Sequence, residues 1–190
     1  IMACRYPYDS NEARTMAASI MGIMTGYSYF VSSLMAQKLG PFEKYDLNSQ
    51  HMLRVIRNHE RVAGARQDNY EGLSYKPMEV NHKVLKQLGW DNVSDILINV
   101  WNMAYKSGME NGYRNAQVSV VAPTGTISFA MDCGATSIEP FYAHVIYKKL
   151  AGGASMVMVN PVIEDALKKL GYSGKQIDDI VGYILRKDDK

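Results

Sequence analysis

The stretch from Asn115 to Pro140 constrains the fold of this sequence more than any other part. Over its first residues, small or polar side chains alternate with valines, which predicts a buried β-strand. Pro123 then ends the strand, because proline has no N–H to donate to a sheet. A cluster of hydroxyl side chains around one glycine follows, in the order Thr124, Gly125, Thr126 and Ser128.

This cluster suits an anion site if a short helix begins near Thr126. The first N–H groups of a helix have no partner within it, and the helix dipole is positive at that end, so phosphate is the usual occupant. A purely structural interpretation stands beside this one, because a hydroxyl-capped helix after a strand is common and binds nothing. The residues alone leave both interpretations open.

Composition bounds the class of protein. At 190 residues, with 47% hydrophobic and 21% charged residues, the chain has one domain's length and can bury a core. A net charge of +2 argues against a surface that coats nucleic acid, and no apolar run approaches membrane-spanning length. Two cysteines, Cys4 and Cys133, cannot build a disulfide framework, which favours the cytoplasm. No spacing of histidine or cysteine predicts a metal site.

The periodicity predicts one partial domain over 1–190, mainly helical over 1–113, strand–loop–strand over 114–150, and helical over 151–190. The first helix should open at a capping box of Asp9 and Glu12 and end at Gly40-Pro41. Its predicted apolar face has members three or four residues apart: Met16, Ile20, Ile23, Tyr27, Val31 and Leu34.

Signals of start and stop locate the other elements. Further helices are predicted over 49–65 and after three capping positions, namely Ser94, Asn160 and Ser173. Periodicity predicts one shared face for the first of these, made of Met52, Val55 or Ile56, His59 and Val62. In the helix after Ser94 it places Ile96 or Leu97, Val100 or Trp101, and Ala104 or Tyr105 inward. Residues 69–89 read as irregular, and alternation over 141–148 predicts a second strand. Met156 and Met158 are assigned to a later helical segment.

Several short motifs together resemble the ribonucleotide reductases. Arg114-Asn115-Ala116-Gln117, followed by Ala122-Pro123-Thr124-Gly125-Thr126-Ile127-Ser128, resembles their substrate-phosphate loop. The Thr-Gly-Thr-Ile-Ser form is most like the adenosylcobalamin (vitamin B12)-dependent class II branch. The resemblance runs from near the N-terminus to about Tyr172 and has further members: Tyr8 to Arg14, Gly40-Pro41-Phe42, Met52 to Val55, Ile138-Glu139-Pro140 and Lys148 to Gly153.

The resemblance implies a helix-rich α/β fold, a C-terminal-side fragment of the ten-stranded α/β barrel that forms the catalytic chain of these oxidoreductases. It implies a ribonucleoside di- or triphosphate substrate, radical chemistry that makes deoxyribonucleotides for DNA replication, and adenosylcobalamin as cofactor of the parent enzyme. It assigns substrate-phosphate binding to Pro123, Thr124, Gly125, Thr126, Ile127 and Ser128. Membranes and nucleic acid are not among the partners that it implies.

The catalytic residues are expected outside this chain. In the family, the radical cysteine lies in an Asn-x-Cys-x-Glu loop, and neither Cys4 nor Cys133 has those neighbours. The chain also departs from the class II pattern at Gly134, Ser137 and Phe141, which leaves branches with other radical generators open. We therefore expect the chain to be inactive alone.

Two alternatives to a reductase fragment remain, a stand-alone phosphate- or nucleotide-binding module and a non-catalytic helical interaction domain. Ile1 is not a natural translation start, which favours a piece excised from a longer protein. Part of a barrel exposes strand edges and core surface, so its partners are expected to be the remainder of the reductase barrel or, by self-association, a second copy.

Overall fold

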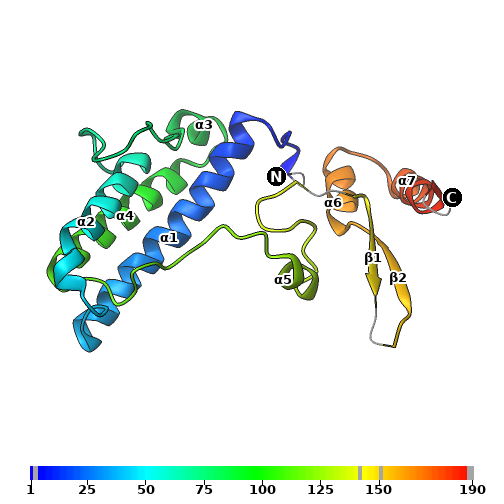
Figure 1. Ribbon diagram of the computed structural model, residues 1–190. Helices are drawn as coiled ribbons and strands as arrows, with labels where there is room; N and C mark the ends of the chain where they lie inside the picture. The colour runs from blue at the N-terminus through cyan, green and yellow to red at the C-terminus, as the bar shows by residue number, and fades with distance from the viewer. Residues whose placement is uncertain (2–3, 141–142, 150–151, 188–190) are drawn as a thin grey trace. The chain divides into compact units, whose positions relative to one another are not determined.

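The computed structural model describes residues 1, 4–140, 143–149 and 152–187, and helices dominate it, as predicted (Figure 1). The chain divides into two compact units. The helical unit comprises Arg14–Val120, and the loop–hairpin unit comprises Ile1–Ala13 together with Val121–Lys190. None of the helices in the described part of the chain is both long and apolar enough to cross a membrane.

The long helix α1 (Asn11–Leu39) begins and ends close to its predicted limits. Ser10 caps the helix, because the Ser10 hydroxyl accepts from the Ala13 N–H at 3.1 Å. At the other end, Gly40 adopts φ +79° and donates its N–H to the Ala36 carbonyl at 2.8 Å. This glycine stop is the one that the sequence predicts.

The apolar face predicted for α1 is wrong for most of its members. Small residues face α4 (Asp91–Asn111) instead: a Cβ added at Gly22 would lie 2.8 Å from Leu97, and one at Gly26 would lie 2.5 Å from Val100. Close approach of two helices requires such small residues. Four predicted core side chains are exposed as a result: Ile20 by 53%, Tyr27 by 55%, Val31 by 37% and Leu34 by 41%.

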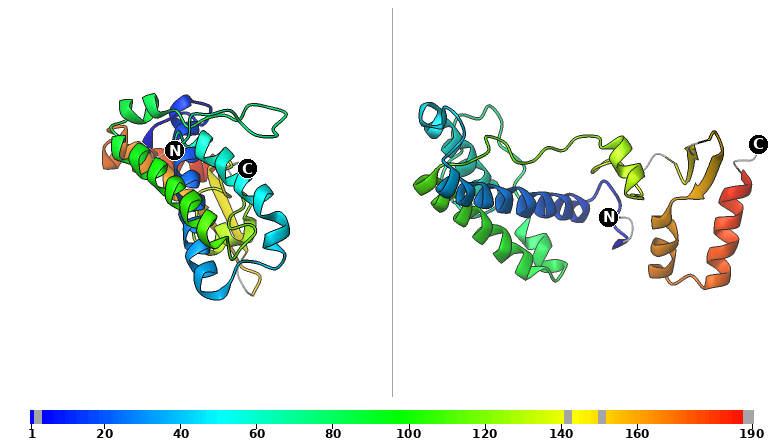
Figure 2. Two further views of the ribbon diagram at one scale, coloured as in Figure 1. Left: turned by 90° about the vertical axis from the view of Figure 1, so that its left-hand side faces the viewer. Right: turned by 90° about the horizontal axis from the view of Figure 1, so that it is seen from below.

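Helices α2 (Tyr45–Val62) and α4 lie side by side in the helical unit (Figures 1 and 2). The buried residues between them fall on the faces that the periodicity predicts: Met52, Ile56, Leu97, Trp101 and Ala104. Helix α2 begins before the predicted position 49, because Lys44 adopts φ 63° and turns the chain directly into Tyr45.

The segment predicted as irregular contains α3 (His82–Gln87), which Asn81 caps by accepting from the Val84 N–H at 3.2 Å. One turn and a half is too short to produce a periodic signal. Helix α4 also begins earlier than predicted, since Ser94 does not cap it. The Ser94 hydroxyl instead hydrogen-bonds Nδ1 of His82 at 2.5 Å.

Ion pairs fix the irregular chain between α2 and α3. The Arg57 guanidinium bonds both Glu71 carboxylate oxygens, at 2.8 and 2.6 Å. Arg61, whose side chain is buried, donates to the same carboxylate at 2.7 Å and to Asp68 at 2.8 Å. These hydrogen bonds, first from Arg57 and then from Arg61, lower the pKa of Glu71 to about 2.

The strand predicted ahead of the hydroxyl cluster pairs with no other strand among the described residues. The chain runs alongside α1 instead, where the Ser32 hydroxyl accepts from the Asn115 N–H and donates to its Oδ1, both at 2.9 Å. Further along, the Thr25 and Ser119 hydroxyls lie 2.8 Å apart. Val120, predicted to be buried, is 73% exposed. A ladder needs a second strand to receive its hydrogen bonds, and the described segments supply none here.

The loop–hairpin unit contains an antiparallel hairpin of β1 (Val145–Lys149) and β2 (Ser155–Val159), with Val145 opposite Val159. Strand β1 confirms part of the predicted second strand. Residues 141–142 lie outside the described residues, and Ala143 and His144 precede the strand. Strand β2 overturns the helical assignment of residues 156–158. Gly152 and Gly153, at φ 102° and 90°, lie in the turn that returns the chain onto β1.

Helices α6 (Pro161–Lys169) and α7 (Gly174–Lys187) follow the hairpin and confirm their predicted caps. Asn160 accepts from the Val162 N–H at 3.1 Å, with proline in the first helical turn. The Ser173 N–H donates to the Gln176 side chain at 2.9 Å, which forms a capping box. Helix α7 packs against both α6 and β2.

Candidate functional site

The hydroxyl cluster lies in the loop–hairpin unit at the start of the short helix α5 (Gly125–Ala130), close to the predicted helix start. Thr124 precedes the helix at φ 49°, in the left-handed region, so the chain turns sharply there. The Ser128 N–H donates to the Thr124 carbonyl at 2.9 Å, and the two hydroxyls lie 3.1 Å apart. These contacts between Thr124 and Ser128 therefore hold the turn together.

The first turn of α5 is open. The N–H groups of Gly125, Thr126 and Ile127 precede the first intrahelical hydrogen bond and so have no partner within the helix. All three residues are exposed, Ile127 by 62%. A Cβ added at Gly125 would meet no atom within 4 Å beyond the adjacent residues. A ligand can therefore approach this backbone closely.

The members of the predicted site differ in exposure. Pro123 is exposed at the entry of the loop, and the Thr126 side chain is exposed in the first turn. Ser128 is only 7% exposed, and its N–H and hydroxyl are both directed to Thr124. Ser128 thus shapes the loop from inside, whereas Thr126 presents a hydroxyl to solvent.

Two residues of the reductase motifs have partners outside the hydroxyl cluster. Arg114 lies in the helical unit, where its guanidinium donates to the Pro41 carbonyl at 3.2 Å. Glu139 donates its N–H to the Thr136 carbonyl at 3.0 Å, within the chain that follows α5. None of the described residues forms a group of three or more His, Cys, Asp or Glu side chains suited to a metal ion.

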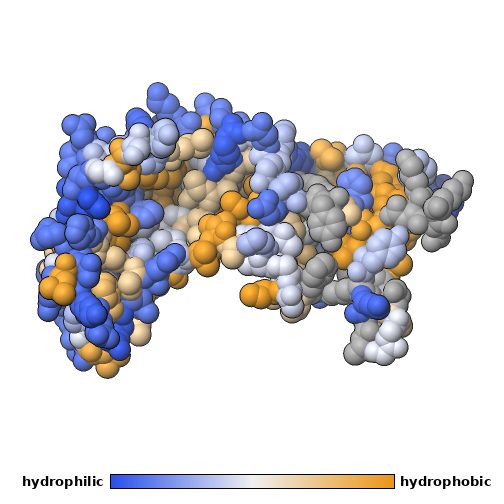
Figure 3. All heavy atoms as spheres, in the orientation of Figure 1, coloured by the Kyte–Doolittle hydropathy of each residue, from blue (hydrophilic) through white to orange (hydrophobic). Residues whose placement is uncertain are grey.

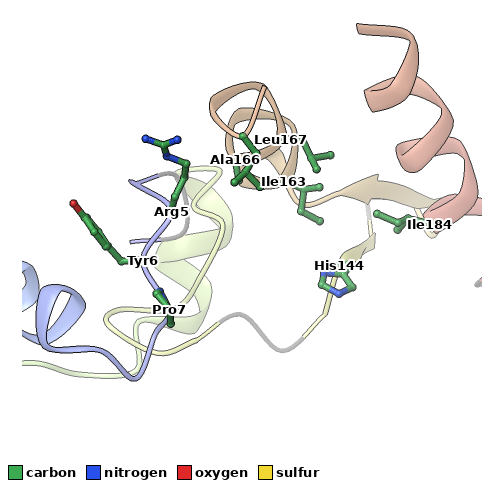
Figure 4. A pocket seen from close by; sticks show the side chains of 9 residues that line it. Arg5, Tyr6, Pro7, His144, Ile163, Ala166, Leu167 and Ile184 are labelled. Carbon is green, nitrogen blue, oxygen red and sulfur yellow. The ribbon is translucent and has the colours of Figure 1, made fainter. Parts of the chain in front are cut away.

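A pocket of about 370 Å³ lies elsewhere in the loop–hairpin unit (Figure 4). Ile163 and Leu167 of α6 lie on the side of that helix toward Ile184 of α7. The walls are mostly apolar, with Arg5 and His144 as the basic members, and none of residues 123–128 lines them. This pocket suits an apolar group rather than a phosphate.

Comparison with known proteins identifies the family. Residues 1–188 match the family described as "Ribonucleotide reductase, barrel domain". The chain belongs to the ribonucleotide reductases. The resemblance seen in the sequence motifs is therefore confirmed.

Similar reductases come from several bacteria. The vitamin B12-dependent ribonucleotide reductase of Agrobacterium fabrum is 44% identical over 96% of this chain and 14% of its own length. That of Bradyrhizobium diazoefficiens is 43% identical, again over 96% of this chain and 14% of the relative. That of Streptomyces coelicolor is 38% identical over 97% of this chain and 17% of the relative. The chain thus spans only a small part of each relative.

The reductase motifs did not single out one buried contact beside the loop. Asn160 donates through Nδ2 to the Gly134 carbonyl at 2.5 Å and is fully buried. The sequence predicts Asn160 as a helix cap. Its contact with Gly134, 26 residues away, could not be predicted from any local sequence pattern.

Proposed function

We propose that this chain holds the phosphate groups of the substrate in a ribonucleotide reductase, with Pro123–Ser128 as the binding loop. The observation that supports this most directly is the open first turn of α5, where three exposed N–H groups lack an intrahelical partner. Family membership adds to it, since the same residues resemble the family's phosphate loop.

In this proposal each loop residue has a distinct role. The N–H groups of Gly125, Thr126 and Ile127 donate to phosphate oxygens, and the exposed Thr126 hydroxyl adds a further donor. Gly125 has no side chain to block the approach. Pro123 fixes the entry of the loop, and the hydroxyl pair of Thr124 and Ser128 holds the turn, at 3.1 Å.

The substrate is a ribonucleoside di- or triphosphate, and the parent enzyme replaces its 2′-hydroxyl by hydrogen. The hydroxyl leaves as water, and a cysteine pair of the parent supplies the two electrons by forming a disulfide. The radical cysteine belongs to another part of the parent, because neither Cys4 nor Cys133 has the Asn and Glu neighbours of the radical loop. This chain therefore contributes substrate binding rather than the radical step.

The names of the relatives support adenosylcobalamin as the cofactor of the parent, where it would generate the thiyl radical. We assign no residue of this chain to the cofactor. Cys4 and Cys133 are free and exposed, which suits a reducing compartment such as the cytoplasm.

The remainder of the reductase is the partner that we propose for the helical unit. Figure 3 shows apolar surface interrupting the hydrophilic covering of this unit. The exposed side chains of α1 that contribute apolar surface recur every three or four residues: Ile20, Met24, Tyr27, Val31 and Leu34. Beside α1, the unpaired chain around Val120 offers backbone to a neighbouring strand. Both features fit a segment of a ten-stranded α/β barrel whose other strands belong to the rest of the parent.

Calorimetric titration of this chain with ADP, CDP and their triphosphates tests the loop. We expect saturable binding that the double substitution Thr126→Ala/Ser128→Ala weakens by at least about tenfold, because it removes the charge-assisted hydrogen bond from the Thr126 hydroxyl and the Thr124–Ser128 hydroxyl pair that holds the turn. The control Ser49→Ala/Ser74→Ala removes two hydroxyls from the helical unit and should bind like the wild type. Equal affinity in the two double variants would contradict the proposal.

A further inference from the structure

Asn160 joins three segments of the loop–hairpin unit. Its Oδ1 accepts from the Val162 N–H at 3.1 Å, and its Nδ2 donates to the Gly134 carbonyl at 2.5 Å. Its backbone N–H donates to the His144 carbonyl at 2.8 Å. The residue is fully buried, so each of these polar groups depends on the partner that the fold supplies.

Gly134 packs directly against the beginning of α6. A Cβ added there would lie 2.5 Å from Cγ2 of Val162 and 2.7 Å from Oδ1 of Asn160. This close approach is a steric observation, independent of the hydrogen bond that Asn160 donates. Both indicate that the backbone of Gly134 is fixed on α6.

The fixed segment continues into the proposed phosphate loop. The Cys133 N–H donates to the Ser128 carbonyl at 2.9 Å, next to Gly134. Ser128 in turn bonds Thr124 through its N–H and its hydroxyl. Helix α5 is too short to be stable by itself, so its position depends on tertiary contacts such as these.

We propose that Asn160 is a positioning residue for substrate phosphate. By holding Gly134 on α6 it fixes the end of α5, and thereby the place of the open N–H groups of Gly125, Thr126 and Ile127. The ligand is a nucleotide phosphate group, and the inference rests on the function proposed for the loop. Asn160 itself does not touch the ligand.

One substitution separates this role from capping. Asn160→Asp keeps an oxygen that accepts from the Val162 N–H, and aspartate caps helices as well as asparagine does. It removes the donor to Gly134 and sets a carboxylate oxygen against the carbonyl oxygen. Asn81→Asp is the matched control, because Asn81 caps α3 through the same kind of contact, at 3.2 Å from the Val84 N–H.

Gly134→Ala supplies a second variant that changes no atom of the α6 cap. Its methyl group would push the chain away from Val162 and Asn160. If Asn160→Asp fails to fold, Gly134→Ala tests the same contact from the other side.

The experiment combines amide NMR of this chain with CDP titration of the same samples. We expect Asn160→Asp and Gly134→Ala to move the amide resonances of Gly125, Thr126 and Ile127 and to weaken CDP binding by about tenfold, whereas Asn81→Asp stays within about twofold of the wild type. Unchanged resonances overturn the positioning. If the amide resonances of Gly125, Thr126 and Ile127 move but the CDP affinity is unchanged, Asn160 has no role in binding.

The Thr126→Ala/Ser128→Ala variant keeps this test distinct from that of the loop. If that variant binds CDP as the wild type does, the proposed phosphate loop is wrong. If the Thr126→Ala/Ser128→Ala variant loses CDP binding while Asn160→Asp and Gly134→Ala retain it, the proposed phosphate loop is supported and the inference about Asn160 is wrong.

Discussion

The Arg57 guanidinium bonds both carboxylate oxygens of Glu71, with Nε 2.8 Å from Oε1 and Nη2 2.6 Å from Oε2. This pairing lowers the pKa of Glu71 to about 2, whereas an unfolded chain leaves glutamate near about 4.3. The unfolded state therefore binds the proton first as the pH falls. The stability contributed by the pair is present above about pH 4.5 and is lost progressively toward pH 2.

Glu71→Gln should flatten this acid dependence. We expect the urea midpoint of the wild type to fall between about pH 4.5 and 2.5, and that of the variant to fall less steeply. At pH 7 the substitution should cost about 1 kcal/mol, since the pair is partly solvated. Glu110→Gln, at an exposed position of α4, should retain the wild-type acid dependence. Parallel slopes for the wild type and Glu71→Gln would contradict this account.

Arg61→Lys should destabilise the helical unit although it keeps the charge. Arg61 donates to Asp68, Glu71 and Asn58 from one planar group, and its side chain is only 4% exposed. A lysine ammonium cannot reach all three acceptors, so we expect a loss of about 2 kcal/mol in urea unfolding. Arg54→Lys, at an exposed position of α2, is the control and should change little.

Two glycine-to-alanine substitutions should change the stability of the fold in opposite directions. In Gly26→Ala the new methyl group would lie 2.5 Å from Cγ1 of Val100 and 3.0 Å from Trp101, so the overpacking should cost about 1–3 kcal/mol. In Gly182→Ala it would meet only Arg186, at 3.7 Å, and helix propensity should add about 0.5–1 kcal/mol. Thermal unfolding of the two variants compares them directly. A stabilising Gly26→Ala would show that α1 and α4 do not approach this closely.

Ser32→Ala should release the chain that runs along α1. The buried Ser32 hydroxyl is the partner of both the N–H and the Oδ1 of Asn115, each at 2.9 Å. We expect a loss of about 1–3 kcal/mol, together with faster amide hydrogen exchange at Asn115. Ser28→Ala removes a hydroxyl that bonds the Met24 carbonyl within α1, so exchange at Asn115 should remain slow in that variant.

The exposed face of α1 should govern association of the isolated chain. Ile20→Lys/Tyr27→Lys changes two side chains that are more than half exposed, so the melting temperature should stay within about 3 °C of the wild type. Sedimentation velocity should show self-association of the wild type and a smaller share of associated species in the variant. Lys83→Ala/Lys86→Ala, on α3, provides a control away from this face. Unchanged sedimentation would exclude α1 as the surface that associates.

Local patterns were sufficient for much of the helical structure. Asn160-Pro161 and the Ser173–Gln176 box located α6 and α7, because capping depends on residues close in sequence. The faces of α2 and α4 followed from periodicity. The face of α1 did not, since most of its predicted members are exposed while Gly22 and Gly26 pack on α4. Hydrophobicity predicts what a helix should bury, whereas this contact depends on backbone approach.

The candidate loop could be predicted from the sequence, but the contacts that position it could not. The open turn at Gly125–Ile127 follows from Pro123 and the hydroxyls around it, so a helix start could be predicted there. Its interpretation as a phosphate loop required the family resemblance. The hydrogen bond from Asn160 to Gly134 could not be predicted from the sequence, because only the tertiary structure brings these two positions, 26 residues apart, into contact. Strand β2 was missed for a related reason, since only its pairing with β1 distinguishes it from a methionine-containing helix.

The hydroxyl contacts along α1 also limit how the chain length can vary. Thr25 and Ser32 are about two helical turns apart, roughly 10 Å, while Ser119 and Asn115 are separated by roughly 13 Å if the chain is extended. The two spans run in opposite directions and are similar in length. An insertion or deletion between Asn115 and Ser119 would break one contact or the other, whereas a Cβ added at Gly152 or Gly153 would meet no atom within 4 Å among the described residues. Length variation among homologous sequences should therefore be tolerated at the hairpin and absent beside α1.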